Sequence, residues 1–195
     1  RGARNPMNSW EWSDSYFNDG EGNFFNILGG KLPPWPEPYT DILIGPNDHD
    51  LMMNLRNAGT DHRKFMRMIT VYMDITAPLY WWKEFDTYKV GTVTNSCSTM
   101  HKIHEKEFTL DDFSHEHLLD AFEADLKRLV VSLNAARCRY LETKDKAFWW
   151  QMIQLLPSSY NQRRTVMLNY EVLANIYKSR RNHKLDEWRM FCDWL

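Results

Sequence analysis

A long amphipathic pattern in the second half of the chain most constrains the fold. Between residues 116 and 141, apolar side chains recur at helical spacing and charged side chains lie between them. The apolar residues are Leu118, Leu119, Phe122, Leu126, Leu129, Val130, Leu133 and Tyr140. This spacing places them on one face, so we expect a helix over 116–141 that buries this face against other elements.

Shorter periodic segments predict further helices over residues 79–88, 148–156, 165–179 and 185–194. Pro78 allows a helix to begin directly after it, and Pro157 ends the helix over 148–156. We also expect Asp48 to cap a short helix that reaches Leu55 and ends at Gly59.

Strand signals are concentrated before residue 77. Ile69, Val71, Met73 and Ile75 alternate with more polar residues, and this period of two is typical of a half-buried strand. The hydroxyl-rich segment 91–99 predicts a loop with the donors and acceptors to hold a phosphate or a flat heterocycle. We therefore expect an α+β chain dominated by helices, without internal repeats or an interdomain linker.

Composition excludes several classes of protein. A length of 195 residues suits one domain that buries a core without disulfides. Its 24 Lys and Arg nearly balance 26 Asp and Glu, which argues against a strongly basic surface for nucleic acid. Mean hydropathy is −0.60, and we expect no membrane span. Cys97, Cys138 and Cys192 are odd in number and lack close pairing, which favours a reducing compartment and a cytoplasmic location.

The first 46 residues form an irregular segment rich in glycine, proline and aromatic residues, and we expect the folded domain over 47–195. Phe, Trp and Tyr make up 14% of the chain, more than a plain core requires. The rings at Trp10, Trp12 and Trp35 allow two interpretations. They wrap over a neighbouring surface of the chain, or they contribute to a surface for a ligand or a second subunit.

A basic cluster follows the helix predicted over 165–179, and it consists of Lys178, Arg180, Arg181, His183 and Lys184. These side chains either interact with the helix dipole or bind an anion. The histidines at positions 101, 104, 115 and 117 do not have the spacing of a zinc site, so we expect no metal. The chain has no evident nucleophile motif, glycine-rich phosphate loop or dinucleotide fingerprint.

Two segments carry a family resemblance. The first runs from Ala77 to His101 and reads APLYWWKEFDTYKVGTVTNSCSTMH. The second begins at Leu155-Leu156-Pro157 and continues through Asn169, Asn175, Arg180 and Trp188. In order and separation these pieces resemble the flavin-dependent thymidylate synthases, the ThyX family, over about residues 48–195. In that family a strand leads into an Ala-Pro helix start, and a helix with two asparagines and an arginine follows a Leu-Pro turn.

The chain resembles the family more closely in the order and spacing of these segments than in the Arg-His-Arg signature. Thr87, Tyr88 and Lys89 stand in the three signature positions. Glu84 stands where the family usually has a glutamine that approaches the uracil, and Met100 stands where an arginine usually reaches the nucleotide.

The resemblance nevertheless implies two sets of binding residues. Those that it implies for the flavin are Lys89, Thr92, Asn95, Asn169 and Asn175. Those that it implies for the nucleotide are Glu84, Ser98 and Arg180. The reaction of the family uses no protein nucleophile, so the resemblance assigns no catalytic residue.

The implied fold is a helix-dominated single α+β domain with a small antiparallel sheet. The implied activity is the reductive methylation of dUMP or a related pyrimidine nucleotide, with hydride from reduced FAD and the carbon from methylenetetrahydrofolate. NADPH is the implied co-substrate, and the implied assembly is a homotetramer. We expect neither a membrane nor a nucleic acid as a partner.

The missing arginines leave two other functions open. Each charge-assisted contact to a phosphate contributes roughly 1.5–3 kcal/mol, so losing two or three weakens dUMP binding by several powers of ten. The chain is then a relative that still binds flavin or nucleotide without making thymidylate. Alternatively, it is an inactive protein of the same fold with a structural or interaction role.

Overall fold

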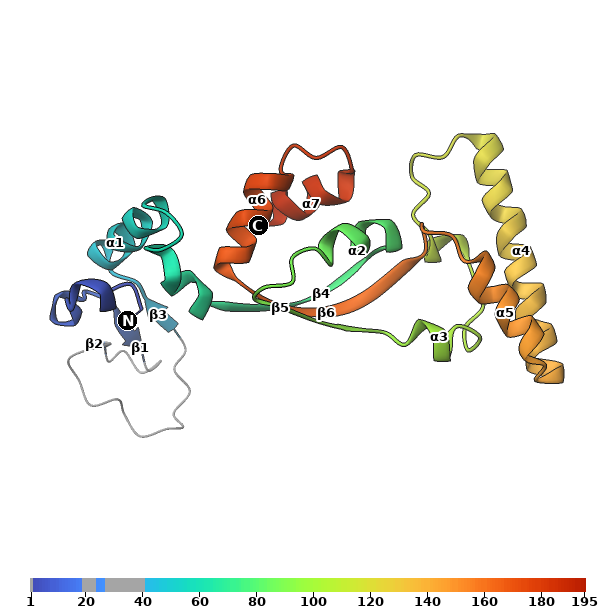
Figure 1. Cartoon of the computed structure of the whole chain (residues 1–195), viewed down its shortest axis with the longest axis horizontal. Coiled ribbons are helices and arrows are strands. Elements are labelled where there is room, and N and C mark those ends of the chain that lie inside the picture. Colours follow the sequence, from blue (N-terminus) through green and yellow to red (C-terminus); the bar gives the residue numbers. More distant parts are fainter. Residues whose placement is uncertain (1, 19–23, 27–40) are drawn as a thin grey trace. The chain divides into compact units, whose positions relative to one another are not determined.

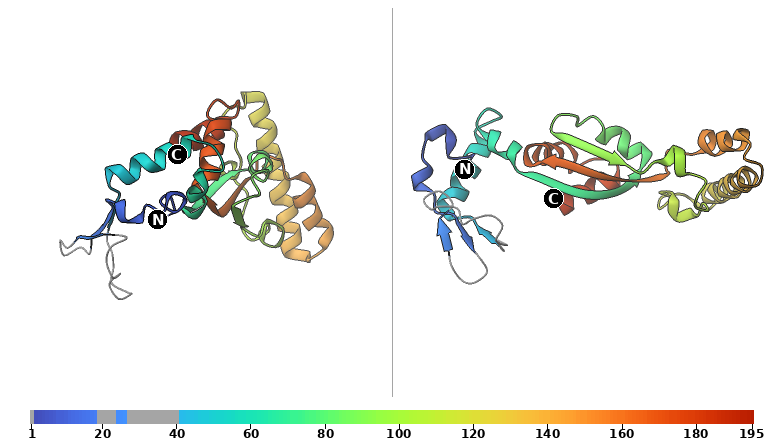
Figure 2. Two further views of the ribbon diagram at one scale, coloured as in Figure 1. Left: turned by 60° about the vertical axis from the view of Figure 1, so that its left-hand side comes forward. Right: turned by 90° about the horizontal axis from the view of Figure 1, so that it is seen from below.

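The computed structural model describes residues 2–18, 24–26 and 41–195. The chain divides into two compact units, residues 1–70 with 169–174 and residues 71–168 with 175–195. We call them the N-terminal unit and the main unit and describe each by itself (Figures 1 and 2). The predicted domain boundary between residues 46 and 47 stays a prediction.

The N-terminal unit begins with two short 3-10 turns, η1 (Asn5–Met7) and η2 (Trp10–Trp12). Its antiparallel sheet has the order β2-β1-β3 and consists of β1 (Tyr16–Asn18), β2 (Phe24–Asn26) and β3 (Asp41–Leu43). It is completed by α1 (Pro46–Asn57), η3 (Arg63–Met68) and the beginning of α6 (Tyr170–Arg180). Trp10 and Trp12 are 43% and 67% exposed, so these rings lie on the surface, whereas Trp35 lies outside the described residues.

The start of α1 is capped from a distant position in the sequence. Asp14 accepts hydrogen bonds from the backbone N–H groups of Asn47 and Asp48, both at 2.9 Å. A Cβ at position 45 would lie 2.2 Å from Cγ of Asp14, so this close approach requires Gly45. The prediction that Asp48 caps the helix is wrong, because Gly45 holds the N-cap position and Asp14 supplies the capping oxygens.

Asp48 instead forms a buried polar network. Its carboxylate accepts hydrogen bonds from Arg4 Nε at 2.6 Å and from the hydroxyl groups of Ser13 and Ser15 at 2.5 and 2.6 Å. Burial by itself raises the pKa of this carboxyl group, but the hydrogen bonds from Ser13, Ser15 and Arg4 outweigh it and lower the pKa below its ordinary value. The ionised form therefore stabilises the N-terminal unit.

The main unit is built on a three-stranded antiparallel sheet of order β4-β6-β5. The strands are β4 (Thr70–Pro78), β5 (Thr92–Ser96) and β6 (Asn161–Asn169). Val166 and Leu168, two positions apart on β6, have no exposed surface. They mark the face of the sheet that α2 (Leu79–Phe85) and α7 (Asp186–Trp194) cover (Figure 1). The strand predicted over 69–76 is confirmed as β4.

In the main unit two strands were not predicted from the sequence, and the first 46 residues, expected to be irregular, also contain β1, β2 and β3. The segment predicted as a loop contains β5, and the beginning of the helix predicted over 165–179 is the end of β6. β5 is an edge strand with four of its five residues exposed, so its sequence shows no alternation. β6 begins with polar residues, and its register with β5, from Thr92 opposite Leu168 to Ser96 opposite Arg164, holds it extended. Pairing between distant segments therefore decides both structures.

A helical hairpin forms the remainder of the main unit. α4 (Asp120–Thr143) and α5 (Lys146–Leu155) lie side by side in Figures 1 and 2. Lys144 adopts a left-handed conformation with φ of 58°, and Asp145 caps α5 by accepting a 2.9 Å hydrogen bond from the N–H of Ala147.

The predicted amphipathic helix is confirmed as α4, and Leu126 and Leu133 of its apolar face join a buried cluster. That cluster consists of Ile103, Phe108, Phe113, Leu126, Leu133, Ala136 and Met152. The beginning of the predicted face is wrong, because Leu118 and Leu119 precede the helix and Phe122 is 59% exposed.

The link between β5 and α4 contains two short elements, α3 (Thr99–Lys102) and η4 (Leu110–Asp112). The helices predicted over 79–88, 148–156 and 185–194 correspond to α2, α5 and α7. In the described part of the chain, no helix combines the length and the apolar character needed to cross a membrane.

Replacing Asp48 by asparagine tests the buried network. Asp48→Asn leaves the Arg4 guanidinium buried without its counter-charge, and we expect the unit to lose about 3 kcal/mol of stability at pH 7. Because the folded-state pKa is lowered, the contribution of the carboxylate is fully present above the unfolded pKa of about 4 and is lost as the pH falls through the folded pKa. Urea unfolding and hydrogen exchange of the α1 amides measure the loss.

The matched control is Asp50→Asn, since Asp50 lies on the same helix with its side chain 79% exposed. Equal effects of the two substitutions at pH 7 would contradict the stabilising role of Asp48. So would a difference between them that persists unchanged well below pH 4.

Candidate functional site

Aromatic packing fixes the position of the candidate site in the main unit. Trp81, Trp82 and Phe85 of α2 are each 1% exposed, and Trp188 of α7 has no exposed surface. The rings of Trp81 and Trp188 have centroids 4.5 Å apart, and those of Trp81 and Phe85 are stacked at 5.1 Å. Large rings packed in this way leave little freedom between α2 and α7. The backbone at the edge of this aromatic core is therefore held in place.

Glu84 lies at that edge, and three nitrogen atoms converge on its carboxylate. Oε2 accepts hydrogen bonds from NH1 of Arg180 at 2.7 Å and from Nε1 of Trp188 at 3.0 Å. Nε2 of His183 lies 3.3 Å from the same oxygen. Glu84 and Arg180, two of the three residues that the resemblance assigns to the nucleotide, are thus in contact with each other.

Arg180 is held from a second side by Tyr88. Its Nε donates a 2.9 Å hydrogen bond to the Tyr88 hydroxyl, and its guanidinium carbon lies 4.8 Å from the centre of the Trp188 ring. Contacts of a guanidinium with an aromatic face and a carboxylate together orient its planar group. Tyr88, which the resemblance aligns with the middle of the family signature, therefore holds an arginine in place.

A cavity of about 300 Å³ borders this cluster, with Tyr88 in its wall. The lining residues are Phe85, Asp86, Tyr88, Lys89, Thr92 and Thr94. A volume of this size is at the small end of ligand-binding pockets. Two residues that the resemblance assigns to the flavin, Lys89 and Thr92, lie here together.

The charges and polar groups of the cavity suit an anionic ligand. Oγ1 of Thr92 is buried and has no hydrogen-bond partner among the described residues. A buried hydroxyl without a partner is unfavourable, so a ligand that bonds to it is stabilised. Asp86 is compensated by Arg164 at 2.8 Å, whereas Lys89 has no ion pair within the described residues. The residues present therefore fit a polar, negatively charged group such as a phosphate.

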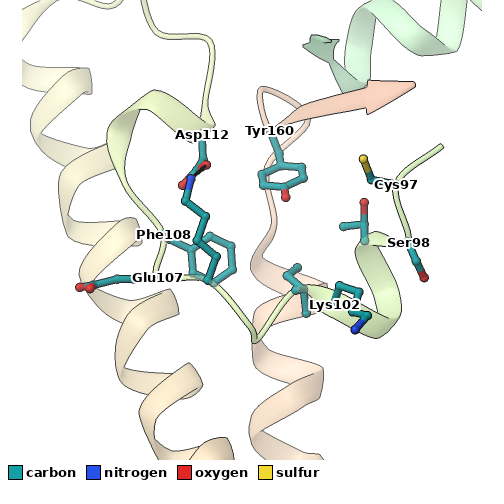
Figure 3. A pocket seen from close by; sticks show the side chains of 10 residues that line it. Cys97, Ser98, Lys102, Glu107, Phe108, Asp112 and Tyr160 are labelled. Atoms are coloured by element: carbon teal, nitrogen blue, oxygen red, sulfur yellow. Dashed lines mark hydrogen bonds and ion pairs between the residues drawn. The ribbon is translucent and has the colours of Figure 1, made fainter. Parts of the chain in front are cut away.

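Ser98 lines a separate pocket of about 110 Å³ (Figure 3). The other residues around it are Cys97, Thr99, Lys102, Ile103, Lys106, Glu107, Phe108, Asp112 and Tyr160. Both lysines are paired, Lys102 with Glu105 at 2.5 Å and Lys106 with Asp112 at 3.1 Å. Burial raises the pKa of Tyr160, so its phenol stays neutral. This pocket offers hydroxyl groups and paired charges, with no cation in excess.

The three asparagines assigned to the flavin lie in different surroundings. Asn95 is exposed on β5, where it pairs with Thr165 of β6. Asn169 is buried at the end of β6, and its side-chain oxygen accepts a 3.1 Å hydrogen bond from the N–H of Val172 at the beginning of α6. Asn175 is exposed on α6. The flavin roles of Asn95, Asn169 and Asn175 stay predictions.

Two members of the basic cluster predicted as an anion site, Arg180 and His183, contact Glu84. Two further arginines on β6 are also ion-paired, Arg163 with Asp74 at 2.6 Å and Arg164 with Asp86. Glu84, Arg180 and Trp188 stand out separately in the sequence, and no local pattern there predicts that they touch. The opposite charges of Glu84 and Arg180 were the only signal in the sequence that could have indicated this contact. Because Glu84 and Arg180 are 96 positions apart in the sequence, their pairing becomes evident only when α2, α6 and α7 are in place.

Double-mutant coupling tests the contact between Glu84 and Arg180. From Glu84→Gln, Arg180→Gln and the double variant we expect a coupling free energy of about 1–2 kcal/mol, because the pair is partly buried and held by further bonds. Thermal and urea unfolding of the four proteins measure it. The exposed Lys102–Glu105 pair provides the comparison, and an equally small coupling at both pairs would contradict the account.

Similar solved structures support the fold described above. No family model and no curated protein matches the sequence. Two crystal structures of the flavin-dependent thymidylate synthase ThyX from Helicobacter pylori, both with FAD and dUMP, align with 98% of this chain. They share 15% sequence identity with it, have a TM-score of 0.65, and are themselves covered over 83% and 84% of their length.

A third structure, the UMP/dUMP methylase PolB from Streptomyces cacaoi, covers 69% of this chain and 72% of its own, with 12% identity and a TM-score of 0.42. That score is too low to support an inference. The two Helicobacter pylori structures, together with the sheet and helices described above, show that this chain has the fold of flavin-dependent thymidylate synthase.

Proposed function

We propose that this protein is a flavin-dependent thymidylate synthase-like enzyme that reductively methylates dUMP or a related pyrimidine nucleotide. The observation that carries the proposal is the shared fold, which extends over 98% of the chain and belongs to a synthase crystallised with FAD and dUMP. The cavity beside Tyr88 supports it, since it combines Lys89, which has no ion pair among the described residues, with a buried Thr92 hydroxyl that has no partner there.

In this proposal Lys89 and Thr92 hold the flavin cofactor. The Lys89 ammonium group attracts a phosphate oxygen, and the Thr92 hydroxyl donates the hydrogen bond that it otherwise lacks. FAD, when bound, supplies the hydride for the reaction. Tyr88 orients its ring through its hydrogen bond with Arg180, and therefore gives the cavity a fixed aromatic wall.

The remaining parts of the proposal follow the family. Methylenetetrahydrofolate supplies the carbon, NADPH reduces the flavin, and Ser98 approaches the nucleotide from its own pocket. The protein works in the cytoplasm as a homotetramer, in which neighbouring subunits complete sites that one chain holds in part. Two cavities of about 300 and 110 Å³ are each small for FAD, which agrees with partial sites.

One observation favours a second candidate function, a protein of this fold that binds flavin or nucleotide without making thymidylate. Arg180, the arginine assigned to the nucleotide, is engaged by Glu84 and Tyr88. Thr87 and Lys89 stand where the family signature has arginines. A lysine does not form the two parallel hydrogen bonds that a guanidinium makes with phosphate. A protein with a purely structural role would lack flavin altogether.

Flavin content of the purified protein tests both functions. We expect a yellow protein with FAD absorbance whose melting temperature rises with added FAD. Lys89→Ala removes a charge-assisted contact and weakens FAD binding about tenfold by calorimetry. Lys83→Ala is the matched control, because Lys83 is an exposed lysine on α2 outside the cavity. A colourless protein that FAD does not stabilise would contradict flavin binding.

Oxidation of the reduced flavin separates the two candidates. If the protein is a synthase, dUMP together with methylenetetrahydrofolate speeds oxidation of the reduced flavin under anaerobic conditions and yields thymidylate. If it only binds flavin, oxidation is independent of dUMP. Gel filtration adds a check on the assembly, since a homotetramer elutes far above the 23.4 kDa of one chain. A strict monomer at micromolar concentration would contradict the shared sites.

A further inference from the structure

The carboxylate of Glu84 lies in surroundings typical of a bound anion. Its Oε2 receives the guanidinium of Arg180 and the indole N–H of Trp188, with the imidazole of His183 at 3.3 Å. These donors come from the end of α6, the following turn and α7, whereas Glu84 comes from α2. One side chain therefore supplies the anion, and a separate part of the chain supplies the donors.

The donors are oriented without the help of Glu84. Trp188 is fully buried among aromatic rings, and Arg180 is fixed by the Tyr88 hydroxyl. His183 accepts a 3.2 Å hydrogen bond at Nδ1 from the N–H of Leu185. In the neutral ring this places the proton on Nε2, which faces the carboxylate. Donors that are aligned before an anion arrives bind it at a lower entropic cost.

Glu84 itself is the least constrained member of the cluster. Its side chain is 35% exposed, compared with 20% for Arg180 and 23% for His183. Only Oε2 is engaged among the described residues, so Oε1 makes no protein hydrogen bond there. A rotation of the glutamate toward solvent would leave the three donors in place and would vacate the space that its carboxylate fills.

We propose that Arg180, His183 and Trp188 form an oxyanion-binding site that Glu84 occupies as an internal ligand and that a phosphate group occupies when the carboxylate is withdrawn. The site holds one guanidinium, one indole N–H and one imidazole, a set that suits the tetrahedral oxygens of phosphate. Because Glu84 is tethered, its effective concentration at the site is millimolar or higher, and a weakly bound free anion cannot displace it. Glu84 thereby sets which anions the site admits.

This inference does not depend on flavin binding, and inorganic phosphate is the probe that tests it. Titration calorimetry at constant ionic strength compares the unaltered protein with Glu84→Gln and Glu84→Ala. We expect both variants to bind phosphate at least tenfold more tightly than the unaltered protein does. The indole N–H resonance of Trp188 in a nitrogen–proton spectrum provides a second readout, since phosphate should shift that signal in the variants.

Two matched variants isolate the cause. Glu187→Gln removes the same charge from α7, where Glu187 accepts a hydrogen bond from Tyr80, and it should leave phosphate binding unchanged. Adding Arg180→Gln to Glu84→Gln should abolish the increase in phosphate affinity. Phosphate binding by folded Glu84→Gln and Glu84→Ala that is no tighter than in the unaltered protein would overturn the proposal, as would an equal gain in Glu187→Gln.

A parallel titration with dUMP identifies the source of the phosphate group. If both dUMP and inorganic phosphate bind the Glu84 variants, the site takes a nucleotide phosphate and supports the proposed enzyme. If inorganic phosphate binds and dUMP does not, the anion site stands while the proposed nucleotide substrate fails. If neither binds, the anion site is refuted, and the flavin content of the unaltered protein still decides the proposed function separately.

Discussion

The contact between Glu84 and Arg180 is the interaction on which the candidate site depends. It joins α2 to the end of α6, and it rests on the packing of Trp81 and Phe85 against Trp188. The aromatic core fixes the helices, and the helices bring a carboxylate to an arginine whose second bond goes to Tyr88. Because Tyr88 also lines the cavity, one set of contacts shapes both the anion cluster and the candidate flavin pocket.

Local periodicity was sufficient to predict most helices, because a helix satisfies its backbone within its own segment. In α4, for example, Leu126 and Leu133 belong to the predicted apolar face, and both are buried as the amphipathic pattern predicts. β5 and β6 were missed because a strand depends on partners far away in the sequence. The cap of α1 was missed for a related reason, since Asp14 reaches the helix from more than 30 residues away.

The roles that the resemblance gives to the site residues stay predictions, and the contacts between these residues were not predicted. Lys89 and Thr92 were assigned by resemblance, and they lie together in one cavity. Glu84 and Arg180 were assigned to a nucleotide, and the chain brings them into contact with each other. The sequence shows which charged side chains are present. Whether two opposite charges attract each other strongly depends on their distance and burial, and the packing of the helices determines both.

The central claim is that this protein has a flavin and nucleotide site that Glu84 controls. A crystal structure of the protein with FAD and dUMP tests it most directly. The account predicts flavin density in contact with Lys89 and Thr92, with the Glu84 carboxylate withdrawn from Arg180 wherever the nucleotide phosphate reaches it. Flavin bound away from Thr92, or a nucleotide phosphate bound elsewhere while Glu84 still contacts Arg180, would contradict the account.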